Sequence, residues 1–552
     1  MDYKENAAKW LEGNFDAETK TEVLKLRASD PAAFEDAFYK NLEFGTGGLR
    51  GLMGVGTNRM NKYTVGMATQ GLANYILSRA GADSYPSVCI SYDSRNNSKL
   101  FARIASDVLS ANGIRVYIFD NIRPTPELSY AVRRKGATAG IMVTASHNPK
   151  EYNGYKVYWS DGAQITSPVD KEIVAEVAKV SDPSEVKFER GERCGEVELM
   201  GKEMDEAYLS DILSLALSPE ARARHSSLKF VYTPLHGCGV RLIPECLKRL
   251  GFTDIIHIPE QDISDGNFPT VASPNPEEPA AMRLALEAAR EHGADVVLAS
   301  DPDADRLGVA VRKGDDFVQL TGNQTAAILT YYILSRRKEL GTLGEGKYVV
   351  KTIVTTELIA AIAKSFGVEC LDVLTGFKYI AEVVREREGK GEFVCGGEES
   401  YGFNVGEFVR DKDAPMGALM VADCAAWAAD QGLDLYGLLQ KIYREYGYRK
   451  EEMVYLVRKG KSGAEEISAI MERLRSEPPA RLAGKEVVRA LDYQQPLKTG
   501  LPASNVLRFF TADEDVVTVR PSGTEPKIKF YFGAVGSDAE ETIEALKKQF
   551  LS

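Results

Sequence analysis

Short apolar runs alternate with longer amphipathic segments along most of the chain. In the first third, three runs have the length of buried strands, and three segments repeat apolar residues at helical spacing. The predicted strands are 88–92, 115–119 and 140–143, and the predicted helices are 70–80, 100–112 and 128–135. This alternation predicts an α/β layer with a parallel or mixed sheet, in which functional side chains gather where strands end.

The same alternation recurs further along the chain. Apolar runs predict strands at 228–233, 254–258, 294–299, 307–311, 348–354, 453–458, 506–511, 516–519 and 528–532. Helical spacing is found at 1–40, 241–250, 324–340, 416–430 and 464–476. At about 150 residues per domain, a chain of 552 residues corresponds to roughly four domains. We place these domains at 1–205, 206–320, 321–440 and 441–552.

The composition argues against several classes of protein. The formal net charge of −12 disfavours binding to nucleic acids or anionic membranes, because such binding surfaces are basic. A phosphorylated substrate stays open, since local Arg and Lys residues can dominate a cleft. Seven cysteines are scattered without a CxxC pair, and no stretch approaches the ~20 apolar residues of a membrane span. We therefore expect a soluble cytoplasmic protein with reduced thiols.

One candidate nucleophile follows the apolar run 140–143. The segment 144–149 reads Thr-Ala-Ser-His-Asn-Pro, and its Asn-Pro end cannot extend a strand because proline lacks a donor. Ser146 is thus expected on a tight loop at a strand end, with His147 beside it and Lys156 ten residues later. All of these residue types are also ordinary in loops, so this segment alone favours neither a catalytic nor a structural role.

Three aspartates alternate directly after the apolar run 294–299. Asp301, Asp303 and Asp305 could converge on a hard divalent cation such as Mg²⁺, which favours phosphate as a further ligand. The following apolar run, 307–311, places them in a strand–loop–strand turn, which disfavours an aspartyl nucleophile of the HAD type. An EF-hand is also disfavoured, because Arg306 and Arg312 would replace its glycine and glutamate. A solvated loop is the remaining alternative.

Two further loops carry polar side chains after apolar runs. Glu398 and Ser400 alternate, and a carboxylate with a hydroxyl suits neighbouring sugar hydroxyls, although a hairpin turn explains the pattern equally well. Near the C-terminus, Arg, two hydroxyls and a glycine make a phosphate cradle between two strands, with a plain hairpin loop as the alternative. The residues of this cradle are Arg520, Ser522, Gly523 and Thr524.

Two more segments carry charge in glycine-rich or loop contexts. The stretch 44–51 sets four glycines around Arg50, which allows the backbone to approach another group and aims the guanidinium, unless the stretch is only a flexible turn. The segment 410–413 precedes a predicted helix and carries Lys412. Taken alone, it also fits a solvated charge cluster at a helix start.

Together, the loops 144–149, 301–306, 397–400 and 520–524 resemble the four signature loops of the α-D-phosphohexomutase superfamily, in the same order. The stretch 44–51, the Gly-Glu-Glu-Ser form of the third loop and the segment 410–413 resemble the phosphoglucomutase branch. With Asn58–Asn61, they are closest to its type-2 subgroup, whose members act on glucose phosphates, pentose phosphates or both. The resemblance implies a heart-shaped, four-domain α/β enzyme, with three similar mixed-sheet domains and a smaller C-terminal α+β domain.

The resemblance also implies a role for individual residues. The implied catalytic residues are Ser146, His147, Lys156, Arg50 and Arg306. Mg²⁺ would be held by Asp301, Asp303 and Asp305 and by an oxygen of phosphorylated Ser146. The implied substrate-binding residues are Thr375, Gly376, Lys378, Glu398, Ser400, Lys412, Arg520, Ser522, Gly523 and Thr524.

The expected reaction interconverts glucose 1-phosphate and glucose 6-phosphate through phosphoserine, with glucose 1,6-bisphosphate as intermediate and activator. A phosphopentomutase, another phosphohexomutase or a glucose 1,6-bisphosphate synthase would use the same loops. Alternatives from other classes are a phosphatase and a non-catalytic sugar-phosphate-binding paralogue. A phosphatase would not need the phosphate cradle, and a paralogue would be expected to lack the nucleophile or a metal ligand. We expect a sugar phosphate as partner, and a monomer or dimer.

Overall fold

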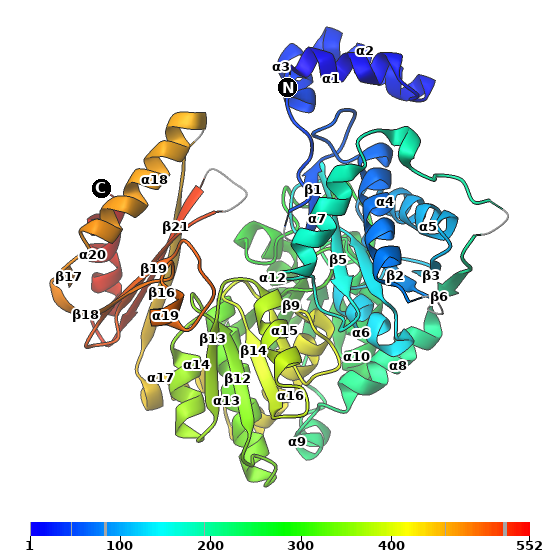
Figure 1. The fold of residues 1–552 in the computed structure, drawn as a ribbon. Coiled ribbons are helices and arrows are strands. Elements are labelled where there is room, and N and C mark those ends of the chain that lie inside the picture. Colours follow the sequence, from blue (N-terminus) through cyan, green and yellow to red (C-terminus); the bar gives the residue numbers. More distant parts are fainter. Residues whose placement is uncertain are drawn as a thin grey trace.

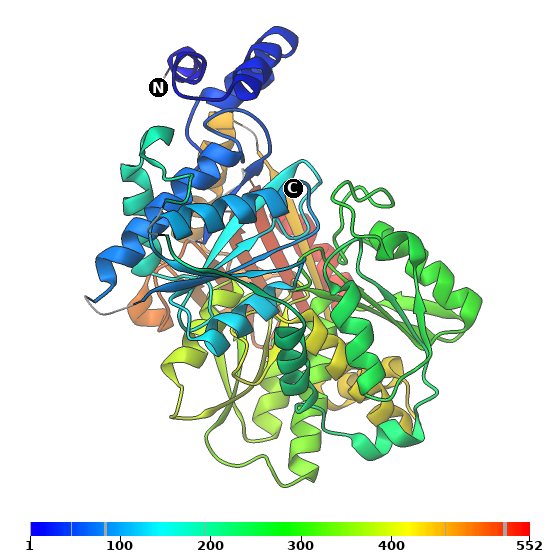
Figure 2. The ribbon, with the colours of Figure 1, turned by 90° about the vertical axis from the view of Figure 1, so that its right-hand side faces the viewer.

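Four sheets organise the residues that the computed structural model describes, namely 2–45, 47–81, 85–191, 194–458, 460–522 and 527–551. In chain order they contain six, five, four and six strands. Figure 1 shows the last sheet, in orange and red, across from the first and next to the third. Figure 2 shows the second domain, in green, beside the first. The predicted α/β class with a smaller C-terminal domain is confirmed.

The first domain is a mixed sheet in the order β1-β5-β4-β2-β3-β6. Its strands are β1 (Gly48–Leu52), β2 (Ser87–Tyr92), β3 (Arg115–Phe119), β4 (Ala139–Val143), β5 (Tyr152–Trp159) and β6 (Val197–Met200). Its helices are α4 (Lys62–Arg79), α5 (Ser98–Ala111), α6 (Thr125–Lys135) and α7 (Val169–Lys179), followed by the short η1 (Pro183–Glu185). Strands β2, β3, β4 and β6 are parallel, and β5 and β1 form antiparallel pairs at one edge. The apolar runs predicted β2, β3 and β4, but not β1 and β5.

The second domain has the sheet order β11-β10-β9-β7-β8. Its strands are β7 (Phe230–Thr233), β8 (Ile255–His257), β9 (Val296–Ser300), β10 (Leu307–Lys313) and β11 (Asp316–Gln319). Its helices are α8 (Lys202–Leu213), α9 (Pro219–Arg224), α10 (Gly239–Arg249), α11 (Pro259–Asp262) and α12 (Pro279–His292). Strands β9 and β10 form the predicted strand–loop–strand turn, as an antiparallel pair that starts at Ser300 and Leu307.

The third domain has the sheet order β13-β12-β14-β15. Its strands are β12 (Lys347–Thr352), β13 (Glu369–Val373), β14 (Glu392–Gly397) and β15 (Phe403–Val405). Its helices are α13 (Gly322–Glu339), α14 (Leu358–Ser365), α15 (Phe377–Glu386), α16 (Ala414–Asp430) and α17 (Leu435–Tyr446). Strands β14 and β15 are antiparallel neighbours, so the loop that carries Glu398 and Ser400 is the hairpin that the sequence allowed.

The fourth domain is an antiparallel sheet in the order β16-β21-β20-β19-β18-β17. Its strands are β16 (Arg449–Val457), β17 (Arg481–Leu482), β18 (Lys485–Asp492), β19 (Leu507–Thr511), β20 (Val516–Pro521) and β21 (Lys527–Val535). Its helices are α18 (Gly460–Ser476), α19 (Pro496–Thr499) and α20 (Ala539–Leu551). Helices α18 and α20 cover this sheet in Figure 1.

Three further helices precede the first sheet and form a small apolar cluster. They are α1 (Tyr3–Glu12), α2 (Ala17–Ser29) and α3 (Pro31–Phe38). Trp10 packs against Phe38 and against Tyr63 of α4, which attaches the cluster to the first domain. Both views show it projecting beyond that domain (Figures 1 and 2). Among the described residues, no helix is long and apolar enough to cross a bilayer.

The first three domains share one hydrophobic cluster in addition to clusters of their own, and the core of the fourth domain is separate. One buried cluster joins Tyr130 of the first domain, Phe230 of the second and Trp427 of the third. The fourth domain has its own core around Phe509 and Phe530. It meets the third domain through a much smaller apolar contact of Ile353, Val354 and Leu374 with Tyr493, Val506 and Tyr531.

An ionic network reinforces this contact between the third and fourth domains. Arg508 of β19 lies 2.8 Å from Glu357, whose carboxylate is also 3.0 Å from the fully buried Nζ of Lys351. Asp372 lies 2.8 Å from the same ammonium. Burial by itself would raise the pKa of Glu357, but the charges of Lys351 and Arg508 outweigh it and lower that pKa to about 2.

We expect Glu357→Gln to weaken the attachment of the fourth domain in a pH-dependent way. Because the folded pKa lies below the ordinary 4.5, the stabilisation is complete above pH 4.5 and is lost as the pH falls toward about 2. The shift corresponds to at most about 3 kcal/mol at neutral pH. Urea unfolding of both proteins across this pH range measures it.

Glu369→Gln is the matched control, because Glu369 pairs with Arg387 at an exposed site where ion pairs contribute little. A stability difference between wild type and Glu357→Gln that stays constant from pH 7 to pH 2 would contradict the assignment.

Candidate active site

Ser146 lies where the first and second domains meet. It sits in the loop between β4 and β5, as the apolar run and the Asn-Pro break predict. Its Oγ donates to Asp301 Oδ2 at 2.7 Å and lies 3.1 Å from Nδ1 of His147. Burial, reinforced by the positive charges of Arg306 and Arg50, lowers the pKa of His147 well below its usual range. The hydroxyl is therefore flanked by a carboxylate and an imidazole.

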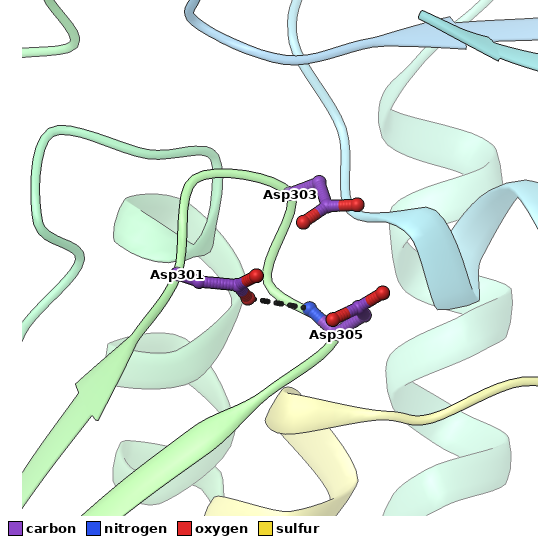
Figure 3. Close-up of side chains that lie close together, drawn as sticks. All are labelled: Asp301, Asp303 and Asp305. Carbon is purple, nitrogen blue, oxygen red and sulfur yellow. Dashed lines mark hydrogen bonds between the residues drawn. The ribbon is translucent and has the colours of Figure 1, made fainter. Parts of the chain in front are cut away.

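The three aspartates converge as the sequence predicts. Figure 3 shows Asp301, Asp303 and Asp305 around the loop between β9 and β10. One carboxylate oxygen from each lies within 4.8 Å of the others, and all three side chains are buried. Asp301 Oδ1 accepts hydrogen bonds from the backbone amides of Asp305 and Arg306 at 3.1 and 3.0 Å. These two bonds hold the loop in a turn around its own first carboxylate.

The donor set fits a hard divalent cation. All three groups supply carboxylate oxygen, the ligand type that Mg²⁺ prefers. Asp303 Oδ1 and Asp305 Oδ1 are buried and accept no hydrogen bond from any described residue. Burial together with the neighbouring charges of Asp303 and Asp305 raises the pKa of Asp301 well above its usual range. A cation would neutralise this repulsion and use the two unpartnered oxygens.

Two lysines balance part of this negative charge. Lys156 Nζ lies 2.8 Å from Asp303 Oδ2 and 3.4 Å from Asp305 Oδ2. Lys412, from the segment before α16, lies 3.1 Å from Asp305 Oδ2. Lys156 therefore pairs with two aspartates of the cluster, while the third, Asp301, contacts the hydroxyl of Ser146. Lys412 of the third domain reaches the second.

A cavity of about 400 Å³ lies between the domains, next to the loops of Ser146 and of the aspartates. His147 and Arg306 of these loops line it, whereas Ser146, the three aspartates, Lys156 and Lys412 do not. The cavity brings together predicted site residues from all four domains: His147, Arg306, Thr375, Ser400 and Arg520. The Oγ1 of Thr375 is buried and has no hydrogen-bond partner among the described residues, so it can donate to a ligand. The cavity thus gathers hydrogen-bond donors from all four domains next to the hydroxyl of Ser146 and the aspartate cluster.

Glu398 lies beside this cavity rather than in its lining. It is buried in the hairpin between β14 and β15, where its backbone amide donates to the carbonyl of Gly402. Burial raises the pKa of its carboxyl to about 7, against the opposing influence of the positive charge of Lys412.

The remaining predicted residues lie at or near the edge of the site. Arg50 is on exposed β1, 3.4 Å from the side-chain oxygen of Asn148. Gly376 caps α15, and Lys378 in its first turn lies over the ring of Tyr379 instead of in the cavity lining. Ser522 follows β20, where its amide donates to the carbonyl of Lys527. Gly523 and Thr524 lie outside the described residues.

Two residues of the site were not predicted. Glu277 lines the cavity and lies 2.5 Å from Arg306, so it orients that guanidinium. Lys529 also lines the cavity, directly across the β20–β21 ladder from Arg520. Neither stands out in the sequence, because the pairing of Lys529 with Arg520 depends on the strand register and the contact of Glu277 with Arg306 depends on the fold. Neither belongs to a motif by itself.

Comparisons with known proteins agree with this geometry. Models of the phosphoglucomutase/phosphomannomutase family match the chain four times: its alpha/beta/alpha domains I, II and III match 41–184, 206–314 and 321–446, and its C-terminal domain matches 461–548. A phosphoglucomutase of Staphylococcus haemolyticus is 36% identical over 511 residues, which cover 90% of this chain and 91% of the relative. One of Staphylococcus aureus (strain MRSA252) is 35% identical over 529 residues, 94% of each chain.

Solved structures show the same fold at lower identity. A putative phosphomannomutase from Thermus thermophilus superposes with a TM-score of 0.71 at 23% identity, covering 93% of this chain and all of the other. The phosphoglucomutase parafusin from Paramecium, in its open form, gives 0.69 at 17% identity and covers 93% and 94%.

We expect Mg²⁺ to raise the melting temperature of the protein through the aspartate cluster. A ligand at 100 times its Kd stabilises the folded state by about 2.7 kcal/mol. Asp303→Asn should abolish most of this Mg²⁺-dependent shift, because it removes a charged ligand. The measurement is the difference in melting temperature with and without Mg²⁺. This difference is needed because Asp303→Asn also relieves the repulsion among the aspartates and so changes the melting temperature in the absence of Mg²⁺.

Asp316→Asn, at an exposed position on β11, is the control and should keep the full shift. An equal Mg²⁺ effect on wild type and on Asp303→Asn would place the cation elsewhere.

Proposed function

The chain belongs to the phosphoglucomutase/phosphomannomutase family, and we propose that it is a phosphoglucomutase that interconverts glucose 1-phosphate and glucose 6-phosphate. Relatives of that name at 35–36% identity over nine-tenths of the chain support this function. The observation that carries it is the 2.7 Å contact of Ser146 with Asp301 of the aspartate cluster, beside a cavity that His147 and Arg306 line together with residues of the third and fourth domains.

Ser146 is the proposed carrier of the phosphoryl group. In the resting enzyme it is phosphoserine, which transfers its phosphoryl group to the free hydroxyl of the hexose monophosphate. The product of this half-reaction is glucose 1,6-bisphosphate, whose other phosphoryl group then returns to Ser146. Burial alone would lower the pKa of Lys156, but its pairing with Asp303 and Asp305 raises that pKa, so the side chain is an ammonium. The ammonium gives a proton to the Oγ of Ser146 as the bond to phosphorus breaks, and Lys156 takes up the proton that the attacking hydroxyl releases. His147 and Arg50 flank the transferring group.

Mg²⁺ bound to Asp301, Asp303 and Asp305 would supply Lewis acidity and neutralise phosphate charge. Arg306, oriented by Glu277, contacts phosphate on the same side of the cavity. Its planar guanidinium suits bidentate contact with phosphate oxygens. In this assignment, residues of the second domain bind the reacting phosphate.

The third and fourth domains hold the rest of the substrate. Glu398 and Ser400 accept and donate hydrogen bonds to equivalent sugar hydroxyls in either orientation of the intermediate. The non-reacting phosphate is held by Lys412, Arg520 and Ser522, with Gly523 and Thr524, and Thr375, Gly376 and Lys378 complete the sugar side. Because the intermediate must bind in two orientations, the residues that bind its phosphates and the residues that bind its hydroxyls are expected on different domains.

The physiological setting is a further part of the proposal. The seven cysteines form no disulfide, which supports a cytoplasmic location. We propose a monomer or dimer that acts on a free sugar phosphate.

Ser146→Ala tests the nucleophile. Loss of the hydroxyl should lower kcat for glucose 1-phosphate by at least about 1,000-fold, because the variant lacks the group that carries the phosphoryl. A coupled assay with glucose 1-phosphate and with ribose 1-phosphate, each with and without glucose 1,6-bisphosphate, measures both the activity and the preference for hexose.

Ser400→Ala is the comparison variant and should mainly raise KM, because it removes one contact to the sugar. Mutase activity that persists in Ser146→Ala would overturn the assignment of the nucleophile. Release of inorganic phosphate without isomer formation would identify a phosphatase instead.

A further inference from the structure

The backbone of Ser146 adopts a conformation that serine rarely occupies. Its φ is 51°, in the left-handed region that disfavours residues with a side chain. Such a conformation persists only where the surrounding structure enforces it, and it is found mostly at functional sites. The contacts of the loop 144–151 should therefore include the group that holds Ser146 in place.

Arg95 supplies most of these contacts. It is fully buried, and its guanidinium donates to four carbonyl groups of the loop and of the first residue of β5. Nη2 donates to the carbonyl oxygen of Ser146 at 2.6 Å and to that of Asn148. Nη1 donates to the carbonyl oxygens of Pro149 at 2.9 Å and Tyr152 at 3.1 Å. The bond to Ser146 fixes the peptide plane that follows its left-handed backbone.

A second path connects the start of this loop to the same arginine. Asp93 Oδ2 lies 3.3 Å from Nε of Arg95 and accepts from the hydroxyl of Thr144 at 2.7 Å. The Thr144 hydroxyl in turn accepts from the amide of Ser146 at 2.8 Å. Both peptide groups that flank Ser146 are thus tied to Asp93 and Arg95, directly after β2.

The second domain closes over the free face of the guanidinium. The ring of Phe268 lies 5.0 Å from the guanidinium carbon of Arg95, within cation–π distance. Phe268 is buried, and its segment is tied to the first domain by Asn267, which accepts from Asn96 at 3.0 Å. In the same segment, Ser273 donates to the carbonyl of His147 at 3.3 Å. The nucleophile loop is therefore clamped from both domains.

We propose that Arg95, clamped by Phe268, is a positioning residue that holds Ser146 in its left-handed conformation and its Oγ against Asp301. The proposal rests on the proposed phosphoglucomutase function. The side chain of Arg95 is fully buried and both of its Nη atoms donate to backbone carbonyls, so it acts through the loop and not on the substrate. Lysine cannot replace it, because one ammonium cannot donate to four carbonyls spread over both ends of a planar fork.

The test compares Arg95→Lys with wild type in three measurements: steady-state kinetics, melting temperature, and phosphorylation of Ser146 by glucose 1,6-bisphosphate followed by intact-protein mass. We expect kcat and the rate of phosphorylation to fall by about 100-fold, because a displacement of the nucleophile of about 1 Å has effects of that size. The KM for glucose 1-phosphate should stay unchanged.

Arg59→Lys is the matched control. Arg59 is also a buried arginine of the first domain that donates to backbone carbonyls, but its partners are Asp36 and Asn58, away from Ser146. The variant Arg59→Lys should alter the melting temperature without changing kcat. Phe268→Ala leaves Arg95 in place and should lower kcat by about fivefold, the value of a weak cation–π contact.

The outcomes separate the two proposals. If wild type takes up no phosphoryl group on Ser146, the proposed function fails. If wild type does and Arg95→Lys matches its kcat, the positioning role is overturned. A fall in kcat that is no larger than the loss of folded protein also overturns the positioning role. Should Arg95→Lys not fold, an unchanged kcat in Phe268→Ala would contradict the proposal.

Discussion

Three carboxylates buried at the junction of two domains are the constraint on which the site depends. Removing charge from water costs several kcal/mol per ion unless opposite charges or ligands compensate. Here the compensation comes from Lys156 of the first domain and Lys412 of the third, both in contact with aspartates of the second. The aspartate cluster therefore draws three domains together and places a nucleophilic hydroxyl at its edge. The same charges prepare the site for a cation.

The hydrophobic clusters also join these three domains more closely to each other than to the fourth. One close-packed cluster spans the first three domains, which restrains their movement relative to each other. The fourth domain carries Arg520 and Lys529 on a separate core, and it joins the third through a small apolar cluster and the network around Arg508. Ser146 and the aspartate cluster are thus on the domains that share buried apolar contacts. Arg520, which is proposed to hold the distant phosphate, is on the domain with the smaller attachment.

The sequence predicted the elements whose apolar runs are uninterrupted. Strands β2, β3, β4, β9 and β10 are such runs, and the loops that follow β4 and β9 carry the nucleophile and the aspartates. Strand β5 escaped prediction because Asn153 and Lys156 interrupt its apolar pattern, although the strand is largely buried. One of these two polar residues, Lys156, is the residue that reaches Asp303 and Asp305, so the contact with the aspartates accounts for part of the interruption.

Contacts between distant segments were out of reach for a related reason. Glu277 and Arg95 have ordinary neighbours in the sequence, and only the fold shows that one faces Arg306 and the other the loop of Ser146. Arg95 had an indirect signal, since it follows β2, and parallel β2 and β4 are neighbours whose carboxyl ends meet at one edge. Using that signal requires the strand order, which the apolar pattern does not contain.

Strand register connects these observations to the chemistry. Strand β5 pairs with β4 so that Lys156 lies opposite Met142, and with β1 so that it lies opposite Gly48. Gly48 has a φ of 133°, and a Cβ there would collide with the backbone of Tyr155, so the glycine-rich stretch permits this close pairing. A slip of one residue would turn Lys156 to the opposite face of the sheet, away from Asp303. The contact between Lys156 and Asp303 therefore depends on the strand pairing that Gly48 permits.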